Sequence, residues 1–177
     1  MQQYLVHLLH YSGKSQLDLI LSYKLKSMKA EHVWLDSRNL ICTDSNYTFA
    51  AVNFEITNQR ISKSIHRHPS QLYIAPGFIS SDADGITTTL GRGGSDYTAA
   101  IFADALHAGL VEIWTDVSGM MTADPRLVPN AKVIPHISYK EAMELSHFGA
   151  KVIYPPTIQP VMLKGIPLWI KNTFAPD

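Results

Sequence analysis

The segment best suited to bind an anion is a run of glycines that precedes a helix-forming stretch. Residues 91–94 read Gly-Arg-Gly-Gly, and Ser95 then opens a mainly apolar stretch that continues to residue 108. Glycines let the backbone approach a ligand closely, and the first turn of a helix offers unpaired N–H groups to a negative charge. Arg92 adds a planar fork that fits a carboxylate or a phosphate. A tight turn with Arg92 at the surface explains the same residues equally well.

Three further polar points follow the glycine loop along the chain. Thr115-Asp116 stands directly after the apolar segment 110–114, and ligands of open α/β sheets bind at such carboxyl ends of strands. Asp124-Pro125-Arg126 is a rigid turn that carries a cation, and Lys151 follows a predicted helix. Each has a plain structural explanation, since Thr115-Asp116 can cap a helix and Lys151 can complement a helix dipole. Together with the glycine loop they suit a phosphorylated ligand.

Other candidate motifs are weaker. Gly13-Lys14-Ser15 resembles the end of a P-loop, but Leu8 stands where that motif needs its first glycine. The segment 66–68, His-Arg-His, lacks the spacing of metal ligands on a helix, and His136 and His147 are best explained as polar residues beside a helix. No metal ligand is therefore assigned.

The elements that must position these residues follow from periodicity and from breaker residues. A strand, the glycine loop, a helix and a second strand follow one another, which predicts an α/β fold with a mainly parallel sheet and covered faces. Ser95 is the predicted N-cap of this helix, and Gly109 is predicted to follow its last turn. Trp34, Trp114 and Trp169 stand in apolar strands, which predicts core positions. The predicted helices are 15–30, 52–65, 95–108, 138–148 and one after Pro155-Pro156 that ends near Gly165; the predicted strands are 32–35, 72–75, 87–90, 110–114 and 168–170; loops or turns are predicted over 43–50, 80–86 and 117–137.

Composition limits the class of protein. The chain has 177 residues, 46% of them hydrophobic, and its 15 basic and 15 acidic side chains give a formal net charge of zero. These values indicate one globular domain and argue against a nucleic-acid binder, which needs a basic face. The single cysteine, Cys42, excludes a disulfide scaffold and a cysteine-based zinc site. Without a signal-peptide pattern or an apolar run of ~20 residues, we expect a cytoplasmic protein that does not bind membranes.

Four segments resemble aspartokinases, which are members of the amino acid kinase family. The order and the spacing of the segments match as well as their residues. The resemblance is strong over 72–175 and moderate over 34–65, where Asp36-Ser37-Arg38 with Thr43-Asp44 matches a further motif. The residues of segment 138–152 are most similar to the kinase part of bifunctional aspartokinase–homoserine dehydrogenases. The four segments are TTTLGRGGSDYTAA (87–100), WTDVSGMMTADPR (114–126), ELSHFGAKVIYPPT (144–157) and IKNT (170–173).

The resemblance implies a three-layer αβα sandwich with a mainly parallel sheet. It implies transfer of the γ-phosphoryl group of ATP to the β-carboxylate of L-aspartate, the first step towards lysine, threonine and methionine. It also implies ATP and Mg²⁺ as cofactors and a homo-oligomer for the full-length protein. Arg92 and Asp96 are the implied catalytic residues. The implied aspartate-binding residues are Arg92, Gly93, Gly94 and Ser95, and the implied ATP-binding residues are Thr115, Asp116, Met121, Arg126, Lys151 and Val152.

Two motifs of the family are missing from this sequence. The family begins with a Lys-Phe-Gly-Gly-Thr-Ser motif that binds the ATP phosphates, and it carries a Gly-Glu pair whose glutamate binds the amine of the substrate; residues 1–177 contain neither. We therefore expect a partial amino acid kinase domain that is incomplete at its N-terminus, stops before the regulatory ACT domains and is inactive alone. Two alternatives stay open, namely an amino acid kinase for another small carboxylic acid and a nucleotide-binding or assembly module without catalysis.

Overall fold

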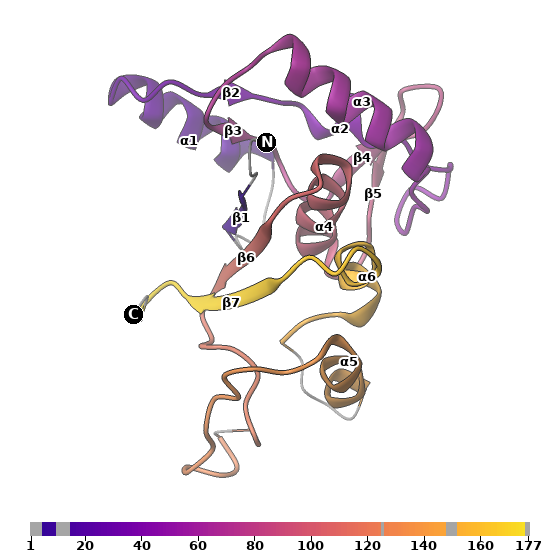
Figure 1. Cartoon of the computed structure of the whole chain (residues 1–177). Helices are drawn as coiled ribbons and strands as arrows, with labels where there is room; N and C mark the ends of the chain where they lie inside the picture. Colours follow the sequence, from indigo (N-terminus) through magenta and orange to yellow (C-terminus); the bar gives the residue numbers. More distant parts are fainter. Residues whose placement is uncertain (1–4, 10–14, 125, 148–151, 176–177) are drawn as a thin grey trace.

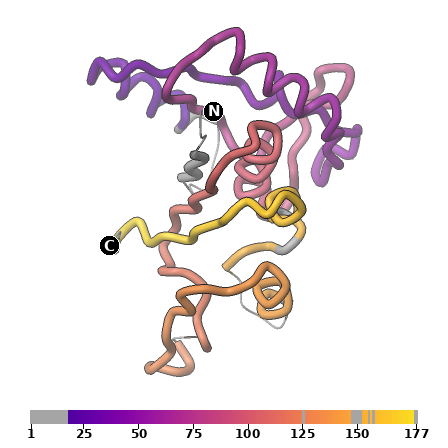
Figure 2. The backbone as a smooth tube through the Cα atoms, in the orientation of Figure 1, coloured from indigo at the N-terminus to yellow at the C-terminus, as the bar shows by residue number. Residues whose placement is uncertain are grey.

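A parallel sheet of three strands lies at the centre of the computed structural model, which describes residues 5–9, 15–124, 126–147 and 152–175 (Figures 1 and 2). β6 (Leu110–Thr115) lies between β1 (Leu5–Leu9) and β7 (Leu168–Asn172). In this register Val111 pairs with Val6 on one side and with Leu168 on the other. β1 is not predicted from the sequence, because its partner strand comes from the far half of the chain and local periodicity cannot reveal that pairing.

One layer of helices covers a face of this sheet. α4 (Gly94–Leu106) and α6 (Pro155–Leu163) pack against each other over the sheet, and α5 (Tyr139–His147) packs on α6 (Figure 1). The small side chains of α4 let its backbone come close to the strands. The buried cluster between the helices and the sheet comprises Ala99, Ala100, Ala103, Ala108, Val111, Ile113, Ile153, Ile158, Val161 and Ile166.

The other side of α4 packs on a second group of elements. α3 (Phe54–Arg67) lies against α4, next to the parallel pair β2 (Val33–Trp34) and β3 (Tyr73–Ile74). The short helix α2 (Ser37–Leu40) and an antiparallel hairpin of β4 (Ile79–Ser81) and β5 (Thr87–Thr89) adjoin them. α1 (Ser15–Ser27) is attached at the edge of this group through a hydrogen bond between Ser22 and His32. The core shared with α4 comprises Leu35, Leu40, Ile41, Ile61, Ile65, Leu90, Ile101, Phe102 and Ala105.

Several local predictions are wrong, mainly at the ends of elements. Gly93, in a left-handed conformation, is the N-cap of α4, and Ser95 lies inside the first turn. The helix ends at Leu106 with His107 as its C-cap, so Gly109 does not directly follow its last turn. The turn predicted over 80–86 is shorter, because residues 80 and 81 belong to β4 and pair with β5. The predicted helix 15–30 ends at Ser27, and the four-residue α2 was not predicted.

The core position predicted for Trp169 is also wrong, because 51% of this residue is exposed. Trp34 and Trp114 are half-buried. Trp169 and Trp114 both contact the ammonium group of Lys171, at 5.2 and 5.1 Å from their ring centres. Lys171 also forms an ion pair with Glu112 at 3.2 Å, so alternation along β6 and β7 places these four side chains on the sheet face opposite to Val111.

The α/β class and the mainly parallel sheet are confirmed, since β4–β5 is the one antiparallel pair among the strands of the described residues. No helix in that part of the chain is both long enough and apolar enough to cross a bilayer. The remaining predicted helices and strands appear as α3, α5, α6, β2, β3, β5, β6 and β7, with their ends shifted by a few residues.

Thr57 offers a test of how α3 is attached. Its buried Oγ1 accepts a hydrogen bond from the backbone N–H of Cys42 at 3.0 Å. Thr57→Val keeps the shape but leaves that N–H without its acceptor, so we expect a loss of ~1–3 kcal/mol in the free energy of unfolding, measured with urea. Thr48→Val, at an exposed position, is the control and should change stability by less than ~0.5 kcal/mol. Equal effects of the two substitutions would contradict this role of Thr57.

Candidate active site

Two groups of predicted site residues flank the central sheet: Arg92 with residues 93–96 at the start of α4, and Thr115 with Asp116 at the end of β6. α4 leads directly into β6 and α6 leads into β7, and the two helices pack against each other (Figure 1). The guanidinium carbon of Arg92, just before α4, lies 5.7 Å from the ring centre of Tyr154, which is the N-cap of α6. The two helix N-termini are therefore neighbours.

Neither of these N-termini carries a side-chain cap. Gly91 and Gly93 have φ angles of 72° and 68°, which favour glycine, and the N–H of Gly94 donates to the carbonyl of Gly91 at 3.0 Å. The first turn of α4 can thus present backbone amides to an anion, which the helix dipole also favours, whereas α6 begins with two prolines, which have no N–H to donate. Asp96 lies in the first turn of α4 and is 7% exposed, whereas Ser95 is half-buried.

A second loop, residues 76–78, braces the glycine loop. The N–H of Phe78 donates to Thr98 Oγ1 at 3.0 Å, and this hydroxyl donates to the carbonyl of Gly94 at 2.8 Å. The N–H of Leu90 donates in turn to the carbonyl of Phe78 at 3.0 Å. A Cβ atom at Gly94 would lie 2.7 Å from the ring of Phe78, so a larger residue would push the two loops apart.

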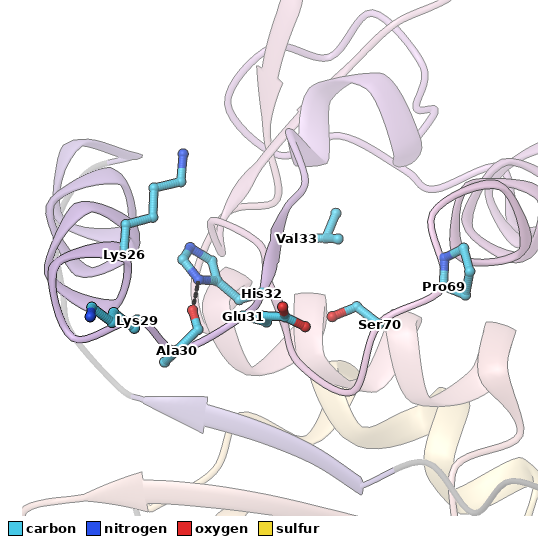
Figure 3. Close-up of a pocket in the computed structure, with 8 residues that line it drawn as sticks. All are labelled: Lys26, Lys29, Ala30, Glu31, His32, Val33, Pro69 and Ser70. Atoms are coloured by element: carbon cyan, nitrogen blue, oxygen red, sulfur yellow. Dashed lines mark hydrogen bonds between the residues drawn. The ribbon is translucent and has the colours of Figure 1, made fainter.

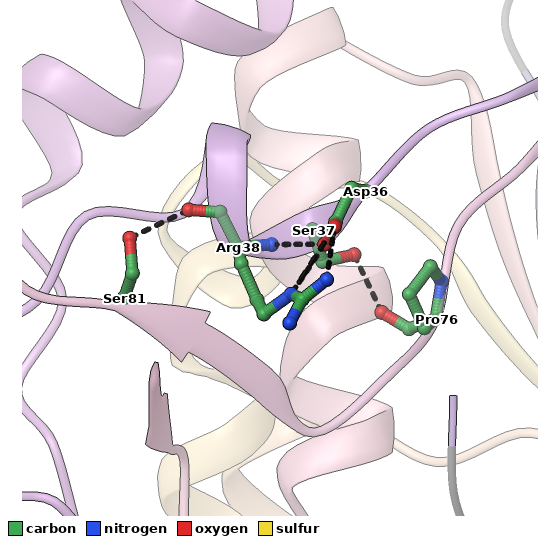
Figure 4. A network of polar contacts seen from close by, with 5 residues as sticks. All are labelled: Asp36, Ser37, Arg38, Pro76 and Ser81. Atoms are coloured by element: carbon green, nitrogen blue, oxygen red, sulfur yellow. Dashed lines mark hydrogen bonds and ion pairs between the residues drawn. The ribbon is translucent and has the colours of Figure 1, made fainter. Parts of the chain in front are cut away.

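The brace is itself attached to α2, as Figure 4 shows. Ser37 Oγ, fully buried, donates to the carbonyl of Pro76, and Ser81 Oγ donates to the carbonyl of Arg38 at 2.6 Å. The carboxylate of Asp36 accepts both from the backbone and from the guanidinium of Arg38. The side-chain hydrogen bond from Arg38 holds the pKa of Asp36 below its ordinary value. The motif Asp36-Ser37-Arg38 therefore fixes a loop next to the site.

The residues predicted to contact the nucleotide lie beyond the end of β6. Thr115 is the last residue of the strand, and its hydroxyl donates to Asp116 Oδ1 at 3.2 Å. The N–H of Thr173 donates to the carbonyl of Thr115 at 2.8 Å, which fixes the strand end against β7. Met121 is half-buried and forms an isolated antiparallel β-bridge with Val133 within the long loop 117–137.

Arg126 is held by its neighbour Asp124. The two side chains form a two-point contact, with Nη2 and Oδ2 2.7 Å apart, and the guanidinium is 87% exposed. The hydrogen bond from Arg126 lowers the pKa of Asp124 to about 2. Val152 is half-buried and packs against the core cluster under the sheet. Lys151 lies outside the described residues, as does Pro125.

The structure thus groups Arg92 and residues 93–96 at the N-terminus of α4 and places Thr115 and Asp116 at the end of β6. A hollow of about 560 Å³ lies elsewhere, at the start of β2 and β3 (Figure 3). It is open to solvent, and both ring nitrogens of His32 beside it are engaged, with Ser22 and with the carbonyl of Ala30. This hollow is therefore separate from the residues that carry the predicted chemistry. It is lined by Lys26, Lys29, Ala30, Glu31, His32, Val33, Pro69 and Ser70.

Two phenyl groups beside the glycine loop were missed by the sequence analysis. Phe78 contacts Gly94, and Phe49 contacts Gly91, from loops that are distant in the sequence. Phe78 has a φ of 75°, unusual for a residue with a side chain, which no sequence pattern announces. Both contacts depend on the fold, because neither aromatic residue lies in the glycine motif.

The pair of Asp124 and Arg126 predicts a measurable titration. Arg126→Gln removes the hydrogen bond that stabilises the carboxylate, so the pKa of Asp124 should rise from about 2 towards its ordinary value of 3.8, followed by carboxyl carbon NMR. Arg38→Gln is the matched control, because it should raise the pKa of Asp36 and leave Asp124 unchanged. An unaltered Asp124 titration in Arg126→Gln would show that the two groups are not paired in solution.

Comparison with known proteins agrees with this geometry. Residues 5–172 match the amino acid kinase family. The chloroplastic bifunctional aspartokinase/homoserine dehydrogenase 2 of Zea mays is 43% identical over 156 residues, which cover 88% of this chain and 17% of the relative. Lysine-sensitive aspartokinase 3 of Escherichia coli K12 is 39% identical over 165 residues, covering 93% of this chain and 37% of the relative. The chain thus spans well under half of the length of these relatives.

Solved structures show the same fold. The crystal structure of E. coli aspartokinase III in complex with aspartate and ADP is 40% identical, covers 90% of this chain and superimposes with a TM-score of 0.84. The UMP kinase of Ureaplasma parvum, at 19% identity and a TM-score of 0.58, shares the fold alone. The expected αβα fold class is confirmed, and the match over almost the whole length shows that the chain belongs to the amino acid kinase family.

Proposed function

We propose that this chain provides binding sites for L-aspartate and for the nucleotide in an aspartate kinase, which transfers the γ-phosphoryl group of ATP to the β-carboxylate of aspartate. The observation that carries the proposal is the N-terminus of α4, which has no side-chain cap, with Arg92 beside it and the N-terminus of α6 as its neighbour. Relatives named aspartokinases, and the neighbour that holds aspartate and ADP, support it.

The acceptor side is assigned to the N-terminus of α4. A carboxylate there can accept hydrogen bonds from the backbone N–H groups of Gly93 and Ser95 and from the fork of Arg92, while Gly94, whose N–H donates to Gly91, has no side chain to block its close approach. Arg92 is exposed and held only by its contact with the Tyr154 ring among the interactions described, so its guanidinium can turn towards a ligand. Asp96, buried in the first turn of α4, is assigned to the organisation of this acceptor site.

The nucleotide side is assigned to Thr115, Asp116, Met121 and Arg126, with Lys151 and the backbone of Val152. Mg²⁺ is bound by oxygen ligands, commonly one or two carboxylates together with substrate phosphates. The exposed carboxylate of Asp116 fits that requirement, although no group of three metal-ligating side chains occurs in the described part of the chain. When bound, the ion would offset the negative charge of the phosphates.

The reaction places simple demands on these residues. The nucleophile is already a carboxylate, so no general base is needed, and catalysis rests on positioning and on cations that offset the repulsion between two anions. Arg92 can neutralise the acceptor, while Arg126 and Lys151 can neutralise the phosphates. Arg126 can keep Asp124 on its Nε–Nη2 edge and offer its Nη1 side to the phosphate, because a guanidinium carries five N–H donors.

Activity of the 177 residues alone is expected to be absent. Their sequence contains neither the Lys-Phe-Gly-Gly-Thr-Ser motif nor the Gly-Glu pair of the family, and removing one preorganised charge commonly costs ~10²–10³ in rate. A coupled assay of ADP release with aspartate and Mg-ATP should therefore give the same rate with and without the chain. Turnover at the level of a complete aspartate kinase would overturn this expectation.

Affinity measurements distinguish the aspartate side of the site from the nucleotide side. Arg92→Lys keeps the charge but loses the fork, so the affinity for aspartate should fall roughly tenfold to a hundredfold while the affinity for ADP stays the same, measured by calorimetry. Arg126→Lys is the reciprocal variant and should weaken ADP binding alone. If the wild-type chain binds neither ligand, the proposed function is wrong; if Arg92→Lys alters only ADP binding, the two sides are assigned in reverse.

A further inference from the structure

The phenyl ring of Phe49 occupies the place that a side chain at Gly91 would take. A Cβ atom built on Gly91 would lie 2.2 Å from Cδ2 and 2.7 Å from Cε2 of this ring. The ring therefore rests directly on the backbone of the glycine loop, one residue before Arg92. Phe49 is nevertheless 55% exposed, so its position is not explained by burial in the core.

The loop that carries Phe49 is closed on itself. Residues 44–51 lie between α2 and α3, and the carboxylate of Asp44 accepts hydrogen bonds from the N–H of Asn46 and the N–H of Ala51, at 3.2 and 3.0 Å. The N–H of Asp44 donates to the carbonyl of Ala51, and that of Phe49 to the carbonyl of Asn46. These bonds give the loop a defined shape at its base and at its tip.

The same loop is joined to the strand that leads into the glycine loop. The N–H of Thr89 donates to the carbonyl of Tyr47 at 2.9 Å, and the N–H of Ala50 donates to the carbonyl of Thr89 at 3.0 Å. The Thr89 hydroxyl also donates to the carbonyl of Tyr47, at 3.1 Å. Because Thr89 stands two residues before Gly91, these bonds fix the height of the Phe49 ring over the glycine loop.

We propose that Phe49 is a positioning residue for the acceptor site, which holds Gly91 in its left-handed conformation and thereby orients Arg92. Glycine adopts positive and negative φ almost equally, so the sequence of the glycine loop alone does not select the φ of 72°. The Phe49 ring and the hydrogen bonds of Thr89 hold Gly91 at this φ angle. The importance for aspartate binding rests on the proposed function, whereas the effect on the loop does not.

Trypsin gives a readout of loop order that needs no ligand, because it cleaves after Arg92. Phe49→Ala removes the ring, and we expect the rate of cleavage between Arg92 and Gly93 in the full chain to rise about five- to tenfold through local opening. Tyr47→Ala is the matched control, since this neighbouring aromatic residue is 48% exposed and its carbonyl stays in place. Cleavage after Arg60, within α3, should be equal in all variants and shows that the fold is intact.

Calorimetry of the same variants tests the consequence for the acceptor site. Phe49→Ala should weaken aspartate binding by a similar five- to tenfold factor and leave ADP binding unchanged, and Phe49→Tyr should restore wild-type values, because the tyrosine ring covers Gly91 equally. Gly91→Ala should weaken binding more in the wild type than in Phe49→Ala, where the added methyl group has room.

The outcomes are distinguishable. Equal cleavage after Arg92 in Phe49→Ala and Tyr47→Ala overturns the proposal, as does increased cleavage with unchanged aspartate affinity. Absence of aspartate binding to the wild-type chain refutes the proposed function instead, and with it the link to the acceptor, while the proteolysis result still decides whether Phe49 orders the glycine loop.

Discussion

Helix α4 is packed on two sides at once, and this constraint sets the position of the candidate site. Ala99, Ala100 and Ala103 pack towards the sheet, and Ile101, Phe102 and Ala105 pack on the other side, so that ten of its thirteen residues are buried. At its far end the carboxylate of Asp104 accepts a hydrogen bond from Asn58 of α3 at 2.7 Å and pairs with Lys164 after α6 at 3.2 Å. A helix held in this way cannot slide or turn, so its first-turn amides are preorganised for a ligand.

The loops around that first turn pack closely together, and this packing restricts their backbone conformation. Gly91 and Gly94 have rings of Phe49 and Phe78 where a side chain would stand, and Phe78 itself adopts a positive φ. Positive φ at a residue with a side chain costs free energy and persists only where the surroundings impose it. Here Thr98 and Leu90 impose it by hydrogen bonds to the Phe78 backbone. The strain lies beside the proposed acceptor surface, where a fixed geometry is useful.

The sequence predicted what depends on local pattern and failed where distant segments meet. The helix 95–108 and the strand 110–114 were found within a few residues, because alanine spacing and the apolar run are strong signals. The strand β1 was missed, since its pairing with β6 is a long-range choice, and Ser95 was taken as N-cap because the left-handed conformation of Gly93 cannot be inferred from an abundance of glycine. The core position predicted for Trp169 is wrong because its ring contacts the ammonium group of Lys171 at the surface.

The candidate site shows the same division. Asp116 was correctly predicted to follow a strand that ends at Thr115, and Arg92 to precede a helix, because both positions follow from the order of elements. The supporting residues around Arg92 could not be found in this way. Phe49 reaches Gly91 only through the bonds between its loop and Thr89, and Ser37 reaches the loop 76–78 only through the packing of α2. Motif patterns predict the groups proposed to contact ligands, whereas the supporting residues follow from the fold alone.

The most direct test of the account is an amide NMR titration of the chain with L-aspartate. If the acceptor carboxylate binds at the N-terminus of α4, the largest shift changes should fall on the N–H groups of residues 93–96, and the residues around the hollow beside His32 should be unaffected. Changes confined to residues 26–33 and 69–70, or no saturable change in residues 93–96, would contradict the assignment of the acceptor site to this helix.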